Sequence, residues 1–131
     1  MKSKIILASL AAIVFSVSAQ AAEPDVDKGK KVFRKCKACH EVKKEKNKVG
    51  PHLINLFGRK AGLMEGYKFS KAMKAKGTDE GLVWNDETLD AYLTKPKDFV
   101  KGTKMAFPGL KKEKDRVNII AYLKTFSKGD Q

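Results

Sequence analysis

Both cysteines of this chain and one of its two histidines lie within five residues, Cys36-Lys37-Ala38-Cys39-His40. The spacing C-x-x-C-H is typical of covalent haem attachment, in which each thiol adds to a haem vinyl group and the histidine binds the iron. Two residues between the cysteines let one helical turn reach both vinyl groups. The stretch therefore predicts one haem c, attached through Cys36 and Cys39, with His40 as an iron ligand.

Three other roles for these cysteines explain the five-residue motif less well. A redox-active dithiol normally lies beside a βαβ pattern, and the sequence has none. A structural zinc site needs four ligands, and His52 is the only further histidine. A disulfide between Cys36 and Cys39 would leave the adjacent His40 unexplained. We therefore favour haem attachment.

The N-terminus has the pattern of a secretory signal peptide. Lys2 and Lys4 precede an apolar run from Ile5 to Ala19, and Ala19-Gln20-Ala21 is an A-x-A cleavage site. The alternative is a membrane anchor, but the run of about fifteen residues is shorter than the roughly twenty that span a bilayer. We expect a signal peptide over residues 1–21, one domain over 22–131, export to the periplasm and no stable membrane insertion.

The expected mature chain is small and strongly basic. The formal charge of +13 falls to +11 once Lys2 and Lys4 are removed with the signal. The sequence has no nucleic-acid-binding motif, and its cations are mostly lysines rather than the arginines that phosphate readers favour. We therefore expect no nucleic acid. The charge is either a solubilising surface or a docking face for acidic partners.

The pattern of caps and breakers predicts an all-α fold. We expect a first helix from near Asp25 through Phe33, a short helix over 70–76 that stops at Gly77, and a helix over 86–94 capped by Asn85. Glycines and Pro51 predict loops over 41–67. A turn or short helix is expected over 98–100, and apolar residues at helical spacing predict a last helix over 113–126.

The second axial ligand decides what the haem does. An open position suits oxygen or peroxide chemistry, whereas a methionine closes the site and suits electron transfer. The candidates are His52, Met64, Met73 and Met105. His52 lies close to His40 in the chain, and so short a connection disfavours His52 as a ligand on the opposite face of the haem. A loop with Pro108 and flanking glycines favours Met105, but the residues alone leave it open whether Met105 only packs in the core.

The chain resembles the class I cytochromes c, in their small bacterial form, over nearly all of the expected mature region. The matching segments are 36–40 (CKACH), 50–53 (GPHL), 56–60 (LFGRK), Trp84, 86–89 (DETL), Tyr92, Leu93, Pro96, Lys97 and 102–105 (GTKM). The resemblance implies a small all-α fold of helices and loops around one covalent haem. It also implies contacts between the first and last helices at Gly29, Phe33, Ile119 and Tyr122.

By the same resemblance Met105 is the second iron ligand, and the carbonyl of Pro51 accepts the free ring N–H of His40. Tyr92 is expected near the Met105 sulfur, and Thr103 near a haem propionate.

The resemblance also places Arg59 and Trp84 near the propionates, where they would stabilise buried carboxylates. Two positions depart from the family pattern. Phe69 stands where many members have a tyrosine, and Met73 where some have an asparagine. Both remove hydrogen-bonding groups, and Met73 becomes a possible competing ligand.

The resemblance implies a one-electron carrier, not an enzyme, and we expect a monomer; the sequence does not decide between a respiratory, a denitrifying and a photosynthetic pathway. Its implied partners are a cytochrome bc-type donor and an oxidase, peroxidase or reaction-centre acceptor. We expect acidic faces of these partners to meet the lysines that flank the haem-contact segments, Lys35, Lys37, Lys97, Lys104, Lys111 and Lys112. The rival functions are a peroxidase or gas-binding haem protein, and a redox subunit bound permanently to one dehydrogenase.

Overall fold

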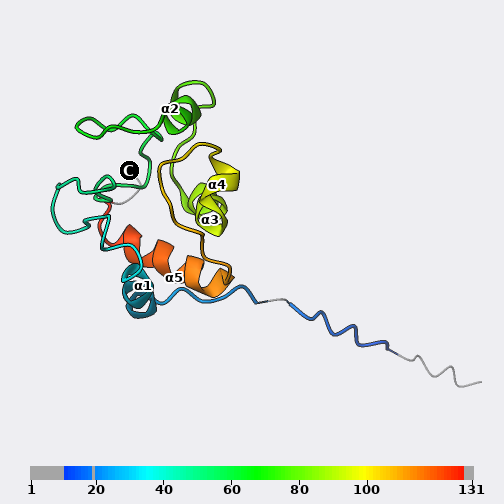
Figure 1. The fold of residues 1–131 in the computed structure, drawn as a ribbon. Helices are drawn as coiled ribbons and strands as arrows, with labels where there is room; N and C mark the ends of the chain where they lie inside the picture. Colours follow the sequence, from blue (N-terminus) through cyan, green and yellow to red (C-terminus); the bar gives the residue numbers. More distant parts are fainter. Residues whose placement is uncertain (1–10, 19, 129–131) are drawn as a thin grey trace, which may run out of the picture.

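Five helices make up the regular structure in the computed structural model, which describes residues 11–18 and 20–128. They are α1 (Val26–Phe33), α2 (Lys71–Thr78), α3 (Asp86–Thr94), α4 (Pro96–Phe99) and α5 (Glu113–Lys124). Figure 1 shows α1 against α5 in the lower half of the view and α2, α3 and α4 in the upper half, joined by long loops. The only pairing of β type among the described residues is one isolated bridge, Lys60 with Val83. The all-α prediction is confirmed.

The predicted helix caps are present. The carboxylate of Asp25 accepts a hydrogen bond from the backbone N–H of Lys28, and this bond lowers the pKa of Asp25. Asn85 and Thr88 form a reciprocal capping box at the start of α3. The starts of α1 and α3 were predictable because a cap is a local interaction within four residues.

The most extensive helix contact is between α1 and α5, as predicted. A Cβ atom on Gly29 would lie 2.0 Å from the carbonyl oxygen of Asn118, so only glycine permits this approach. Phe33 packs against Tyr122 with ring centroids 5.5 Å apart. The buried face of α5 also contains Asn118, whose side chain accepts a hydrogen bond from the backbone N–H of Asp25. The sequence pattern did not reveal this polar link.

Three helix ends differ from prediction. Gly77 lies inside α2, which ends at Thr78, because it packs against the backbone of Ala61 and does not act as a terminator. α4 begins at Pro96 instead of Asp98, since proline is favourable in the first turn of a helix. α5 ends at Lys124, and the chain to Ser127 continues in turns.

The N-terminal segment is separate from this helical body. Residues 11–18 are exposed and have no regular structure, while 1–10 and 19, which belong to the predicted signal peptide, lie outside the described residues. The Ala19-Gln20-Ala21 site is thus only partly described. In the described part of the chain, none of the helices has the length and apolar character that crossing a membrane requires.

Candidate haem site

A cavity of about 380 Å³ lies between the helices and the long loops, and its walls are mainly apolar. All nine residues predicted to bind the cofactor line it: Cys36, Cys39, His40, Pro51, Arg59, Trp84, Tyr92, Thr103 and Met105. Of the other ligand candidates, Met73 lines the cavity, whereas His52 and Met64 do not. The fold thus assembles one site from segments spread over 70 residues of chain.

The two cysteines reach the cavity because the chain keeps turning after α1 ends. Backbone N–H groups of Cys36 and His40 donate to the carbonyls of Phe33 and Cys36, at 2.8 and 2.9 Å. Both cysteines are free thiols, and burial together with the neighbouring Cys39 raises the pKa of Cys36 to about 11. No group of three or more metal-binding side chains occurs among the described residues. The disulfide and zinc alternatives therefore have no support in the structure.

His40 is held by backbone atoms on two sides. Its Nδ1 lies 2.7 Å from the carbonyl oxygen of Pro51, and because a carbonyl only accepts, Nδ1 carries the proton. Nε2 is then the nitrogen with a free lone pair. A Cβ on Gly50 would lie 2.4 Å from Cε1 of the ring, so the ring rests directly on the Gly50 backbone. Burial lowers the pKa of His40 and favours the neutral imidazole that binds metals.

The Met105 side of the cavity is held by side chains. The hydroxyls of Tyr92 and Thr103 are 2.9 Å apart, and Thr103 Oγ1 also accepts the backbone N–H of Met105 at 3.3 Å. Tyr92 was expected near the Met105 sulfur and Thr103 near a propionate. In the structure the two hydroxyls bond to each other, and Tyr92, Thr103 and Met105 line the same cavity, so both expectations stay predictions.

Arg59 brings a positive charge to the cavity wall. Its guanidinium donates to the carbonyls of His52 at 3.0 Å and Ile54 at 2.6 Å, and burial lowers its pKa. The ion pairs found among the described residues do not include Arg59. Trp84 lies in the same wall, nearly buried, with its ring centroid 5.1 Å from that of Tyr92. A partly buried cation without a carboxylate partner suits a cofactor that carries carboxylates.

The donor set fits a covalent haem. Two free thiols and a neutral imidazole with one nitrogen available face a mainly apolar cavity, and a cation stands in its wall. Sequence reasoning missed much of the apolar wall, including Leu89 and Leu93 of α3 and Ile119 and Leu123 of α5. The helical spacing of apolar residues predicted α5, but spacing does not distinguish a side chain that contacts protein from one that faces a cofactor.

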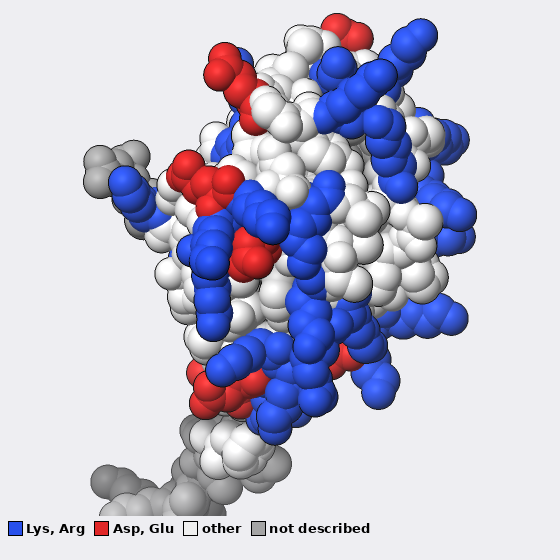
Figure 2. Space-filling view, turned by 60° about the vertical axis from the view of Figure 1, so that its left-hand side comes forward, with Lys and Arg blue, Asp and Glu red and all other residues white. Residues whose placement is uncertain are grey.

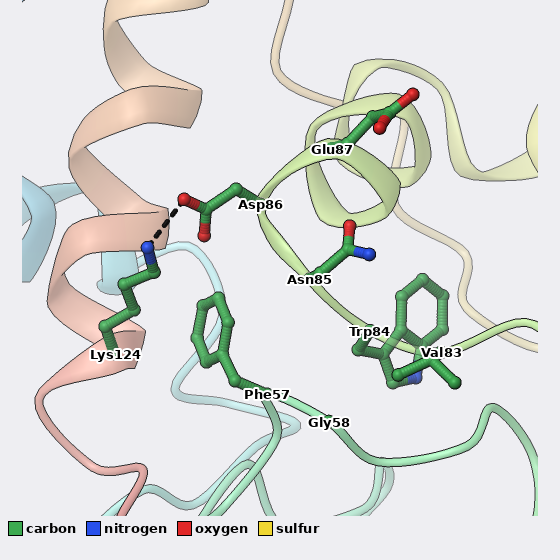
Figure 3. Close-up of a pocket in the computed structure, with 8 residues that line it drawn as sticks. All are labelled: Phe57, Gly58, Val83, Trp84, Asn85, Asp86, Glu87 and Lys124. Carbon is green, nitrogen blue, oxygen red and sulfur yellow. Dashed lines mark hydrogen bonds and ion pairs between the residues drawn. The ribbon is translucent and has the colours of Figure 1, made fainter. Parts of the chain in front are cut away.

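A second depression, of about 450 Å³, is polar and open (Figure 3). Figure 3 shows Lys124 of α5 bonded to Asp86 at the start of α3, with Phe57 beneath them. The depression contains no cysteine or histidine. Its charged groups are explained by the ion pair and by acidic residues at the N-terminus of α3, so it is not a site for the haem.

The predicted docking lysines are exposed without exception. Lys35 and Lys104 line the cavity, and the ammonium of Lys104 donates to the carbonyl of Lys68 at 2.6 Å. Figure 2 shows Lys and Arg side chains spread over one face of the molecule with fewer acidic side chains among them. Positive charge is thus available around the cavity.

Comparisons with known proteins agree with this site. The family model "Cytochrome c" matches residues 26–127. Cytochrome c2 of Afifella marina is 54% identical over 99 residues, covering 75% of this chain and 79% of that protein. Cytochrome c of Gibberella zeae is 51% identical over 106 residues, with 79% and 96% covered.

A solved structure is also similar. Cytochrome cH from Methylobacterium extorquens superimposes with a TM-score of 0.70 at 47% identity, and the match covers 77% of this chain and 98% of that one. Together with the cavity and its thiols, these matches show that the chain belongs to the cytochrome c family, as an electron carrier rather than an enzyme, with haem c attached through Cys36 and Cys39.

Proposed function

We propose that this protein is a periplasmic one-electron shuttle in which His40 and Met105 would hold the haem iron. The bound haem supplies the redox chemistry, because its iron alternates between the ferrous and ferric states. The chain's own residues set the ligand field, keep the cavity dry and present a docking surface. No bond of a substrate is made or broken, so no residue has an acid or base role.

The observation that carries this proposal is the pairing of two features in one cavity. His40 has its Nε2 lone pair available, and Met105 enters from the loop over 101–109. Met73 also lines the cavity, but it is fixed within helix α2, with its backbone N–H bonded to Ser70. Met105 lies on a segment without helix or strand, so no helical hydrogen bonds fix the direction of its side chain.

A pair of matched variants tests the ligand. Met105→Leu and Met73→Leu each remove one thioether from the same cavity wall and keep a similar volume. We expect the weak long-wavelength band that a thioether gives ferric haem in the wild type and in Met73→Leu, and its loss in Met105→Leu. The opposite pattern would assign the ligand to Met73, and no band in the wild type would leave the sixth site open.

Lysine-guided docking is the proposed basis of partner recognition. The donor would be a cytochrome bc-type complex, and the acceptor an oxidase, peroxidase or reaction centre, each with an acidic face. Encounters of this kind are fast and weak, and rising ionic strength slows them because the Debye length falls to about 8 Å at physiological salt. The exposed apolar residues 11–18 support export, since they match the core of a signal peptide.

Charge reversal at two lysines tests the docking surface. Lys35 lines the cavity, while Lys30 lies on α1 and does not. With a purified bc-type complex as donor, we expect Lys35→Glu to lower the second-order reduction rate more than Lys30→Glu, with a weaker salt dependence. Equal effects would mean that net charge, and not a surface around the cavity, governs the encounter.

A further inference from the structure

The segment that carries Met105 has no helix or strand, so its position depends on the contacts at its two ends. At the first end, Thr103 bonds to the carbonyl of Val100 and to Tyr92. At the second end, the backbone N–H of Leu110 donates to the carbonyl of Leu93 in α3, at 2.7 Å. Between these ends, the Lys104 ammonium donates to the carbonyl of Lys68, and Met105 and Phe107 pack against the core. The two ends add backbone and side-chain bonds to α3 and α5 that these inner residues lack.

Arg116 of α5 makes three hydrogen bonds, and two of them go to the second end of the segment. Its Nη1 donates to the carbonyl of Leu110 at 2.8 Å and to that of Lys111 at 3.1 Å. Its Nε donates to the carboxylate of Asp90 in α3, at 2.6 Å. The Arg116 side chain is only 12% exposed, and its bonds to Asp90 and Leu110 are partly buried, which favours charge-assisted bonds of this kind. One guanidinium thus joins α5, α3 and the end of the Met105 segment.

A second ion pair between the same two helices provides a comparison. Lys124 of α5 bonds to Asp86 of α3 at 2.6 Å (Figure 3), but its side chain is 48% exposed. No bond from Lys124 to a loop carbonyl occurs among the described residues. The two pairs link the same helices at the same distance, and only the Arg116 pair also holds the Met105 segment.

We propose that Arg116 is a positioning residue for the second iron ligand, and that it holds the Met105 segment against α3 so that the thioether stays on the iron. The planar fork of the guanidinium is required, because Nε must meet Asp90 while Nη1 meets the two loop carbonyls. A lysine has one ammonium on a flexible stem and cannot reproduce this arrangement. This role rests on Met105 being the ligand, as proposed above.

Cyanide binding to the ferric holoprotein tests this role, because cyanide can enter only when the thioether leaves. Arg116→Lys and Arg116→Gln are compared with Lys124→Gln, which removes the matched ion pair. We expect both Arg116 variants to bind cyanide about tenfold faster than the wild type, which corresponds to losing one hydrogen bond to a charged group. Lys124→Gln should bind cyanide at the wild-type rate. Each variant should keep the thioether band before cyanide is added.

Several outcomes would overturn the role of Arg116. One is an Arg116→Lys rate within twofold of the wild type, and another is equal acceleration by Lys124→Gln, which would point to general loosening of the α3–α5 contact. If Arg116 variants do not fold with haem, Asp90→Asn keeps both loop bonds and should accelerate cyanide binding by a smaller factor; no acceleration would contradict the proposal. A wild type without the thioether band would refute the Met105 ligation itself, which separates the two failures.

Discussion

The two sides of the cavity are built differently. On the His40 side the contacts come from the backbone: the carbonyl of Pro51 accepts the ring N–H, and the ring lies on the peptide of Gly50. On the Met105 side each end of the segment has a backbone bond that side chains reinforce: the Tyr92 and Thr103 hydroxyls at one end, and Arg116 at the other. Side chains change rotamer far more easily than a packed backbone moves, so we expect the thioether to be the labile ligand and the imidazole the fixed one.

The largest expected effect is on the His40 side. Gly50→Ala places a Cβ 2.4 Å from the His40 ring, so the ring or the backbone must shift and the bond to Pro51 weakens. Overpacking of this kind typically costs about 1–3 kcal/mol. Guanidinium unfolding of the holoprotein measures this loss in the free energy of unfolding. Gly81→Ala is the control, since a Cβ there has no neighbour within 4 Å and adds only backbone strain. Equal losses in the two variants would show that the His40 side tolerates adjustment.

A smaller effect is expected on the Met105 side. Tyr92→Phe removes the hydroxyl that pairs with Thr103, and Thr103→Val removes the other partner. Each should lower the free energy of unfolding by about 1 kcal/mol, the usual net value of a hydrogen bond, and should speed cyanide binding to the ferric protein. In the double variant the two losses should add up to less than their sum, because both remove the bond between Tyr92 and Thr103, while Thr103→Val also removes the acceptor of the Met105 N–H. Full additivity would mean that the two hydroxyls act independently and that this end of the segment is held by other contacts.

The smallest effect concerns pH. Burial and the nearby Arg59 lower the pKa of His52 below its ordinary value of 6.5, although Glu45 opposes the shift. Its Nδ1 is buried and has no hydrogen-bond partner among residues 11–18 and 20–128. The unfolded chain therefore binds a proton more readily than the folded one, so stability is present above pH 6.5 and is lost as the pH falls through 6.5 toward the lower folded value.

Thermal unfolding of the holoprotein at a series of pH values measures the contribution of His52 to stability. His52→Gln should flatten part of the decline in stability below pH 6.5, and it should leave the thioether band unchanged because His52 does not line the cavity. A steeper decline in the variant would reverse the expected sign. A changed band would show that the His52 region also affects the Met105 side.

Much of the fold was predictable because its signals are local. Asp25 and Asn85 each cap a helix where the sequence predicted its start, with a side chain that bonds to a backbone N–H within the first turn. Ser70 caps α2 in the same way, although the sequence placed it inside that helix. Helix ends were less predictable. Gly77 reads as a terminator, but it lies inside α2 because of its contact with Ala61, which is distant in the chain. Asn118 and Arg116 gave no signal, since both act through partners on other elements.

The sequence by itself determined the covalent chemistry. Two thiols and an imidazole at C-x-x-C-H spacing act within one turn of chain, so their function follows from order along the backbone. Only the tertiary structure decided which other side chains line the cavity with these thiols and this imidazole. It brought Met105, Met73, Arg59 and Trp84 to the same cavity and left His52 outside it. The physical reason is that these positions depend on helix packing and on buried hydrogen bonds between distant segments, which spacing along a chain does not specify.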